Sequence, residues 1–429
     1  MRFFKDLVLT VIIFAGVLLL LELGLRLAGV KCEASLYTSE AERGYALRPG
    51  AQGWSVTENE NYVRINAEGM YDKEHTVSRP RDVIRIAVIG SSEAEAQQVP
   101  LDKTFEAVME RELAAELAKC GCKVEVLNFA VPGYSFSQEY LTLHNQVWRY
   151  QPQIVVLATN AYGMLRNTRK LYPGPTLGTP FYVLDHGRLV PDIETRLATP
   201  PDPDRVKWKG RLSDWMNKSR ILSMLNEARV NATRIVARLA SQSHLLKPLK
   251  PSSSSDIPPD YIRNWPYDPM RPEMRESWAI GDAFFKWMKQ DCDDHSAEFW
   301  IVTIGMEEEV NPRMSDRQAS EKRIGVNSLL LSDLYIEELA RNDGIHVITL
   351  APRMGEFALD NQVALHGFFN TEFNDGHWNE TGHRVAGHII AQDLLSGSVF
   401  FKGPLASGMV TSGTGPRSQD ARLCICRSE

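Results

Sequence analysis

The sequence predicts an α/β fold, a three-layer α/β/α flavodoxin-like domain built around a five-stranded parallel sheet. Short, nearly continuous apolar runs alternate along the chain with segments whose apolar residues recur at helical spacing. Parallel strands need crossover helices and are buried on both faces, and this alternation is their usual pattern. The chain has 429 residues, 43% of them hydrophobic, which is enough for a core of this size.

The expected strands and helices follow one another in a regular order. The five strands are expected at 84–89, 124–129, 154–158, 299–304 and 345–350. The helices are expected at 104–119, 137–150, 274–291, 328–342 and 380–395. A polar, turn-rich stretch precedes them, and its one alternating segment, Tyr62–Asn66, indicates an edge strand or one arm of a hairpin.

The N-terminus contains an apolar run, residues 7–27, that is long enough to cross a bilayer as a helix. Arg2 and Lys5 precede the run, so we expect the N-terminus in the cytoplasm and the rest of the chain outside it, in the periplasm. Glu22 and Arg26 lie four residues apart and can pair on one face of the helix. The sequence therefore predicts a single-pass membrane protein.

A cleaved signal peptide is the alternative to this anchor. The apolar run is longer than the core of a usual signal peptide, and residues 29–32 lack the small residue expected before a cleaved or lipidated site. An uncleaved anchor is therefore the favoured interpretation.

Changes in composition divide the chain into four parts. The α/β/α domain is interrupted by an insertion at about 167–272, rich in Pro, Arg and Lys, with an amphipathic helix expected between Ser213 and Leu239. Long insertions of this kind tend to shape binding sites or dock partners. The four parts are a membrane anchor at 1–31, an arm at 32–80, the α/β/α domain at 81–402 and a disordered tail at 403–429.

Charge and cysteine content indicate whether the chain binds nucleic acid or a metal ion. The formal net charge is -6 with both signs interspersed, so no basic face exists for nucleic acid. The six cysteines are compatible with disulfides in an oxidising compartment, although their pairing stays open. The Cys-x-Cys pairs at 120/122 and 424/426 have no histidines at ligand spacing, so we expect neither a metal site nor a cofactor.

Chemically active residues stand where the predicted strands end, which is where ligands bind in open α/β sheets. Ser92 follows the first strand at a strand-to-helix turn, and Gly133 follows the second strand. Asp375 and His377 precede the last helix. The aspartate can orient the imidazole from its Nδ1 side, leaving the other nitrogen to take a proton from Ser92. The sequence thus predicts Ser92, Asp375 and His377 as catalytic residues.

The same segments carry a resemblance to a known superfamily. Val88–Val99 resembles the first block of SGNH (GDSL-like) hydrolases, Gly133 matches the second-block glycine, and residues 375–377 match the fifth block. Tyr62–Tyr71 is similar to the segment that precedes the hydrolase domain in envelope-anchored bacterial members. The resemblance implies a serine esterase or acyltransferase in which the backbone amides of Ser92 and Gly133 bind the oxyanion.

The chain also departs from the SGNH pattern. Ser91 replaces the aspartate that usually precedes the nucleophile, and Ala94 and Ala96 replace the threonine and glycine of the first block. The third block, 159–164, lacks its asparagine at the usual place, so Asn160 is expected to supply the oxyanion donor only if this loop is rearranged. Loss of one oxyanion donor typically costs about 100- to 1000-fold in turnover.

Three functional hypotheses follow. The first is ester hydrolysis or O-acyl transfer on an acylated, O-acetylated glycan outside the cytoplasm, in contact with envelope polysaccharide machinery. The second, supported by the altered blocks, is a catalytically impaired protein of the same fold that binds a glycan or a membrane partner. The third is an esterase acting on lipids, which would need an apolar groove beside Ser92.

Overall fold

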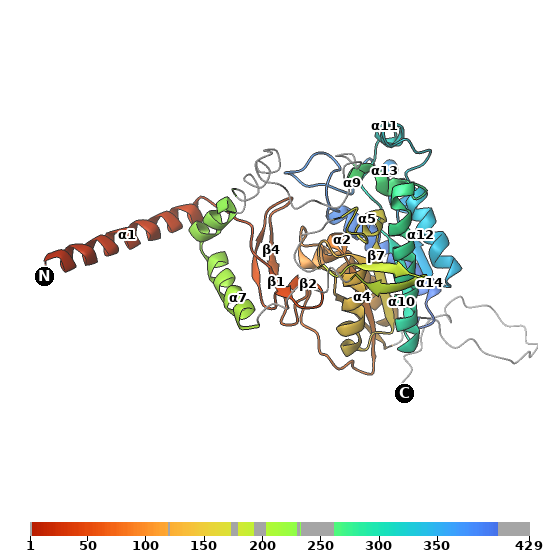
Figure 1. Cartoon of the computed structure of the whole chain (residues 1–429), viewed down its shortest axis with the longest axis horizontal. Helices are drawn as coiled ribbons and strands as arrows, with labels where there is room; N and C mark the ends of the chain where they lie inside the picture. The colour runs from red at the N-terminus through yellow and green to blue at the C-terminus, as the bar shows by residue number, and fades with distance from the viewer. Residues whose placement is uncertain are drawn as a thin grey trace, which may run out of the picture.

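The computed structural model describes residues 2–118, 121–172, 179–192, 203–229, 232 and 261–401. Its centre is a sheet of five strands in the order β11-β10-β7-β5-β6, all neighbours parallel (Figure 1). This is the strand order of a flavodoxin-like sheet, and the predicted fold class is confirmed. The strands are β5 (Val83–Gly90), β6 (Lys123–Asn128), β7 (Ile154–Thr159), β10 (Glu298–Thr303) and β11 (His346–Thr349).

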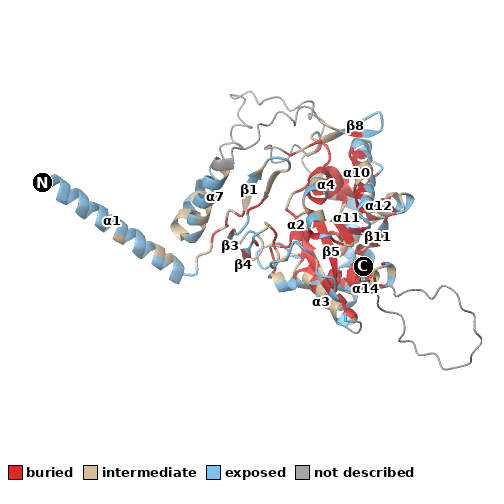
Figure 2. Ribbon diagram, turned by 90° about the horizontal axis from the view of Figure 1, so that it is seen from below, coloured by how far each residue is buried: buried red, intermediate tan, exposed pale blue. Residues whose placement is uncertain are grey.

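Helices cover both faces of the sheet, and side chains of each strand alternate between the two cores. In β5, Ile84, Ile86 and Val88 face one core while Ala87 and Ile89 face the other. Figure 2 shows the buried residues gathered in the sheet and on the inner sides of these helices. One face is covered by α4 (Phe136–Asn145), α10 (Arg275–Asp294) and α12 (Leu331–Asn342), and the other by α3 (Phe105–Leu117), α13 (Ala351–Asn361) and α14 (Glu380–Gly397).

Some helices differ from the expectation. The helix expected at 137–150 is divided into α4 and a 3₁₀ turn, Val147–Tyr150. Among the described helices longer than five residues, α11 (Met314–Ile324) and α13 were not predicted. Helix α11 has no buried residue, so its sequence carries none of the apolar periodicity that marks a helix packed on a core.

The arm before the domain consists of two antiparallel hairpins. Strands β1 (Tyr37–Glu40) and β2 (Gly44–Leu47) form the first, and β3 (Gln52–Ser55) and β4 (Asn61–Arg64) form the second. The alternating segment seen in the sequence is therefore one strand of the second hairpin. The arm shares a small core with the loop after β6, where Val131 and Tyr134 are buried against arm residues. It packs on the α/β domain instead of standing apart from it.

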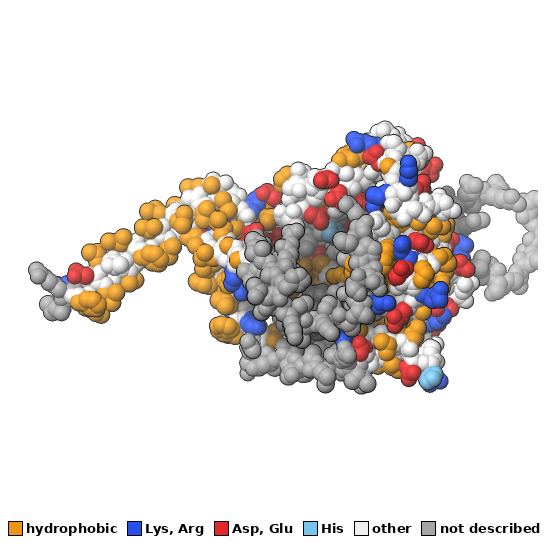
Figure 3. Space-filling model, turned by 45° about the horizontal axis from the view of Figure 1, so that its top comes forward, with side chains coloured by type: hydrophobic (Ala, Val, Ile, Leu, Met, Phe, Trp, Pro, Cys, Tyr) orange, Lys and Arg blue, Asp and Glu red, His pale blue; other side chains and the backbone are white. Residues whose placement is uncertain are grey.

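Helix α1 (Arg2–Leu27) projects from the domain (Figure 1). Apolar side chains line its length (Figure 3). Among the described residues, only α1 is a helix long and apolar enough to cross a membrane. It fits either a membrane span or a signal sequence. Near its end, the Glu22 carboxylate accepts hydrogen bonds from Ser219 Oγ and from the N–H groups of Arg220 and Ile221, at 3.0 to 3.1 Å. Helix α1 is thus tied to the insertion.

Within the insertion, the amphipathic helix expected between Ser213 and Leu239 begins earlier and is interrupted. Helix α7 (Pro203–Lys218) ends before Ser219, and residues 220–229 are helical again. A hairpin of β8 (Tyr182–Asp185) and β9 (Arg188–Pro191) precedes α7. The rest of that expected helix, except residue 232, and the expected tail at 403–429 lie outside the described residues.

Cys122 is disulfide-bonded, whereas Cys32 and Cys292 are free and buried. Within the described ranges, no group of three or more His, Cys, Asp or Glu side chains is placed to hold a metal ion.

Candidate active site

Ser92 lies in the tight turn between β5 and the short helix α2 (Ser92–Glu95). A Cβ added to Gly90 would lie 2.7 Å from the carbonyl oxygen of Ala158 in β7, so only glycine allows the turn to pass this close to the sheet. From the end of β6, Asn128 Nδ2 donates a 2.8 Å hydrogen bond to the carbonyl of Ala94. The turn is therefore held at the carboxyl edge of the sheet by both neighbouring strands.

His377 lies in the loop that leads into α14. His366 links this loop to the end of β10, with Nδ1 2.7 Å from the carbonyl oxygen of Gly376 and Nε2 3.0 Å from that of Gly305. The buried Trp378 donates from Nε1 to the same Gly305 carbonyl, at 3.1 Å. These contacts fix the loop on the same edge of the sheet as Ser92.

The Ser92 turn and the His377 loop touch each other. The N–H of Trp378 donates to Glu93 Oε2 at 3.1 Å, so the residues that follow Ser92 and His377 are hydrogen-bonded to one another. Among the described residues, neither Ser92 Oγ nor His377 Nε2 makes a hydrogen bond. The direct bond between them is not formed in this structure, and the proton transfer stays a prediction.

A carboxylate that sequence reasoning missed lies on the imidazole. Glu58, in the turn between β3 and β4, places Oε1 2.7 Å from His377 Nδ1, and its Oε2 accepts the N–H of His377 at 3.0 Å. The sequence predicted Asp375 at Nδ1, and the structure has Glu58 there instead. Asp375 is not the carboxylate on Nδ1, and its charge acts on the buried carboxyl of Glu307. A catalytic role for Asp375 stays a prediction.

The electrostatics of the site favour a charged imidazole. Burial alone would lower the pKa of His377, but the negative charge of Glu93 and the hydrogen bond to Glu58 outweigh it and raise the pKa to about 9. Burial likewise opposes ionisation of Glu58, yet its hydrogen bond to His377 lowers its pKa below the usual range. At neutral pH the resting site therefore holds an ion pair, and His377 has to lose its proton before it can act as a base.

The two predicted backbone donors of the oxyanion site are open. Within the described part of the chain, the N–H groups of Ser92 and Gly133 make no hydrogen bond. Gly133 has φ +78°, and a Cβ there would lie 2.9 Å from the hydroxyl of Tyr45, so the loop after β6 needs glycine.

Asn160 directly follows β7 and begins helix α5 (Ala161–Leu165). Its Oδ1 accepts the N–H groups of Tyr162 and Gly163, at 3.0 and 3.3 Å, and so caps the helix. Its Nδ2 has no partner among the described residues. Asn160 directly follows Thr159, the last residue of β7, and its role as an oxyanion donor stays a prediction.

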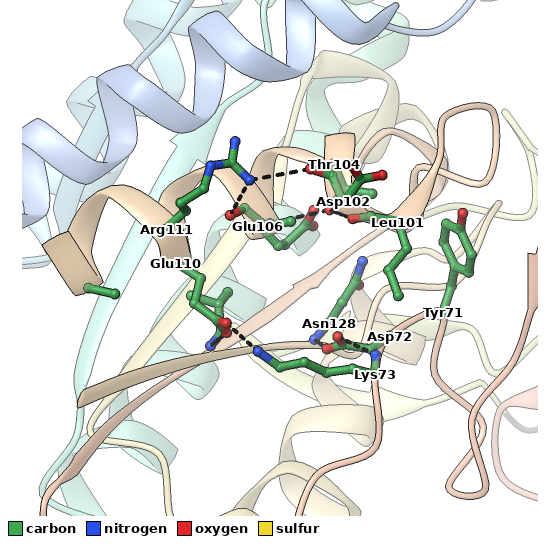
Figure 4. A pocket seen from close by; sticks show the side chains of 13 residues that line it. Tyr71, Asp72, Lys73, Leu101, Asp102, Thr104, Glu106, Glu110, Arg111 and Asn128 are labelled. Carbon is green, nitrogen blue, oxygen red and sulfur yellow. Dashed lines mark hydrogen bonds and ion pairs between the residues drawn. The ribbon is translucent and has the colours of Figure 1, made fainter.

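A cavity of about 600 Å³ lies beside α3, and its lining includes none of the predicted site residues (Figure 4). Lys73 pairs with Glu110 across it, and Asp72 accepts the N–H of Asn128 at 2.9 Å. The carboxyl of Glu106 is buried without a hydrogen-bond partner, and burial raises its pKa well above the usual range. This cavity is separate from the catalytic edge.

Comparisons with known proteins gave fold-level likenesses. No family model matches the chain, and no curated protein does. Among solved structures, the acetyl xylan esterase AlAXEase is 11% identical, over 72% of this chain and 100% of that one, with a TM-score of 0.34. Axe2, an acetylxylan esterase from Geobacillus stearothermophilus, is 8% identical over 72% and 94%, with a TM-score of 0.36. A lipase/acylhydrolase from Enterococcus faecalis is 12% identical over 73% and 96%, with a TM-score of 0.33. Because these values are low, the function proposed below rests on the residues of the site.

Proposed function

We propose that this chain is a serine-dependent ester hydrolase or O-acyltransferase. The observation that carries the proposal is the hydrogen bond from Trp378 N–H to Glu93, which joins the Ser92 turn to the His377 loop at the carboxyl edge of the sheet. Ser92 Oγ attacks the acyl carbonyl, and His377 Nε2 takes the hydroxyl proton. A carboxylate on Nδ1 keeps that nitrogen protonated and stabilises the imidazolium that forms.

The oxyanion of the tetrahedral intermediate needs donors at the same edge. The open N–H groups of Ser92 and Gly133 and the side-chain amide of Asn160 are the candidates. His377 then gives its proton to the leaving alcohol as the ester bond breaks, and the acyl-serine reacts with an acceptor that the neutral His377 deprotonates. Water as the acceptor makes the chain an esterase, and a sugar hydroxyl makes it a transferase.

We place the substrate outside the cytoplasm, on an O-acetylated glycan of the cell envelope. Two features support this location. Helix α1 is long and apolar enough to anchor the chain, and Cys122 is disulfide-bonded, as is common in oxidising compartments. In this proposal α1 is an uncleaved anchor with its N-terminus in the cytoplasm, and the envelope polysaccharide machinery is the partner.

The test uses the full chain in detergent with an aryl acetate as substrate. Ser92→Ala should abolish hydrolysis and labelling by a fluorophosphonate probe. Ser91→Ala is the matched control, since the neighbouring serine makes no side-chain capping bond to α2, and it should keep most of the activity. Equal activity in wild type and Ser92→Ala would contradict the serine mechanism.

The alternative is a catalytically impaired protein that binds a glycan or a membrane partner. The absence of a hydrogen bond between Ser92 Oγ and His377 among the described residues favours it. It predicts that wild-type Ser92 does not react with the fluorophosphonate, while the folded chain still retains acetylated oligosaccharides on an affinity column. Stoichiometric labelling of Ser92 would exclude it.

A further inference from the structure

We propose that Glu58, carried on the hairpin of the arm, is the carboxylate that positions His377, so that the arm completes the active site. The inference rests on the proposed function, because a positioning residue needs a base to position. It assigns to the arm a role that the catalytic domain was expected to supply through Asp375.

The first support is that Glu58 contacts His377 at two points. One carboxylate oxygen lies 2.7 Å from Nδ1 and the other accepts the backbone N–H of the same residue at 3.0 Å. A carboxylate bound in this way fixes the ring orientation as well as the tautomer, which leaves Nε2 for the proton of Ser92. The two side chains keep 20% and 23% of their surface exposed, so the pair is only partly screened by water.

The second support is that the turn bearing Glu58 is held from both sides. On the arm side, the Glu33 carboxylate accepts the N–H of Val56, at 2.7 Å, and the hydroxyl of Thr57, at 3.1 Å. On the domain side, Asn370 Nδ2 lies 3.2 and 3.1 Å from the carbonyls of the same two residues. Asn59 donates to the carbonyl of Gln98 at 2.8 Å. The turn is therefore built into the domain surface around His377.

The third support is the glycine beside the histidine. Gly376 has φ +96°, and a Cβ there would lie 2.9 Å from Glu58 Oε2. A side chain at this position would displace the carboxylate. The loop thus has both the conformation and the empty space that the approach of Glu58 requires.

Other charged groups surround the imidazole, and the test has to separate them from Glu58. Only Glu58 among the described residues hydrogen-bonds the ring. The remaining neighbours act through their charge or line the same edge: Glu93 and Glu95 on α2, Asp375 and His366 on the His377 loop, Glu307 after β10, and His383 on α14.

The experiment measures the titration of His377 in the full chain without using activity. Deuterium exchange at the imidazole C2 hydrogen, followed by mass spectrometry from pH 5 to about 10.5, reports the midpoint for each histidine. We compare wild type with Glu58→Gln, Asp375→Asn and Glu60→Gln. The last is the matched control, because Glu60 lies on the same turn but pairs with Lys31.

Glu58→Gln should lower the His377 midpoint by about one pH unit or more, the usual effect of removing an adjacent opposite charge. Asp375→Asn and Glu60→Gln should leave it in place. The thermal melting temperature should be nearly the same in all four proteins, which shows that the domain is intact. An unchanged His377 midpoint in Glu58→Gln, or a fall in Asp375→Asn instead, would overturn the assignment.

Kinetics then test the positioning role separately. In the aryl acetate assay at about pH 10, above the His377 midpoint in both proteins, Glu58→Gln should lower kcat by at least about 10-fold with little change in KM, since orientation of the base acts in the transition state. Glu60→Gln should match wild type. If wild type has no esterase activity, the proposed function fails while the exchange result still decides whether Glu58 controls His377. If wild type is active and Glu58→Gln keeps full kcat, the inference fails and the proposed function stands.

Discussion

The Glu93 carboxylate accepts a hydrogen bond from the backbone N–H of Trp378, 285 positions further along the chain. This contact joins the turn after the first strand to the loop before the last helix. It also brings the negative charge of Glu93 near His377, where that charge is the first of the influences that raise the histidine pKa.

Replacement of Glu93 tests this relationship. Glu93→Gln keeps an acceptor for the Trp378 N–H but removes the charge, so the pKa of His377 should fall. In a pH profile of kcat/KM for aryl acetate hydrolysis, the midpoint of the acidic limb should move to lower pH. Glu112→Gln, on the exposed side of α3, is the control and should leave the profile unchanged. A profile that does not move in Glu93→Gln contradicts the electrostatic account.

The esterase activity that we propose for the wild-type chain should be highest in alkaline solution. His377 acts as a base only when neutral, and with a pKa of about 9 only about 1% of it is neutral at pH 7. The kcat/KM value should therefore rise with pH through a midpoint near 9. A midpoint near 6.5, the ordinary histidine value, would show that the ion pair with Glu58 does not form in solution.

The same pKa shift makes a prediction about stability. Because the folded-state pKa of His377 is raised, its stabilising contribution is fully present below about pH 6.5 and is lost as the pH rises through about 9. The free energy of unfolding should thus fall over this window by more in wild type than in His377→Gln. Urea unfolding at several pH values measures the difference, and parallel curves for the two proteins would contradict the prediction.

Asn160 caps α5, and we propose that it also donates to the oxyanion; substitution can separate the two roles. Asn160→Ser keeps an oxygen to cap α5 but loses the side-chain N–H donor, so stability should change by less than about 1 kcal/mol. Turnover should still fall by about 100-fold or more, with KM nearly unchanged, because the oxyanion bond strengthens in the transition state. Full turnover in Asn160→Ser would show that the amides of Ser92 and Gly133 are sufficient.

Gly376→Ala should abolish the proposed activity because the new Cβ displaces Glu58, and a control variant can separate this effect from backbone strain. The new Cβ meets Glu58 in a left-handed backbone conformation, so both strain and displacement follow. Gly325→Ala has a similar φ, +85°, with nothing within 4 Å, and should cost only the strain of about 1 kcal/mol. Thermal melting and the aryl acetate assay distinguish the two, since only Gly376→Ala should lose activity. Equal activity of both variants would remove the argument from close approach.

The anchor makes its own prediction. Protein purified from its native membrane should retain residues 1–27, because the apolar run lacks a good cleavage site after it. Intact-mass measurement or N-terminal sequencing checks this. A mature chain that begins near Cys32 would identify α1 as a signal sequence.

The fold could be predicted because parallel strands are buried on both faces. Segments such as 154–158 are apolar without interruption, and each expected strand lies within two residues of an observed one. Helix α11 was missed because none of its residues is buried, so no periodic apolar face marks it. The spacing of apolar residues along a sequence indicates which residues are buried. A helix without buried residues therefore cannot be predicted from that spacing.

The site was harder to predict than the fold. Ser92 follows a strand and His377 precedes a helix. Both lie at the carboxyl ends of the strands, where ligands bind in open α/β sheets. Glu58 lies in the polar turn Glu58-Asn59-Glu60 between two short strands, and the turn contains two glutamates that the sequence does not distinguish. Glu58 and His377 are 319 positions apart, and only the packing of the arm on the domain determines which of the two glutamates contacts the histidine.

Glu22 accepts hydrogen bonds from Ser219, Arg220 and Ile221, and these bonds hold the insertion in a fixed position against helix α1. If α1 spans a membrane as we propose, the rest of the chain is held at one height and one tilt above the bilayer. The edge of the sheet that carries Ser92 and His377 then reaches only a thin layer of space parallel to the lipid surface. In the proposed function, a glycan polymer has to pass through that layer for successive acyl groups to reach Ser92. The spacing of modified sugars along the polymer would then depend on how the polymer moves past the site.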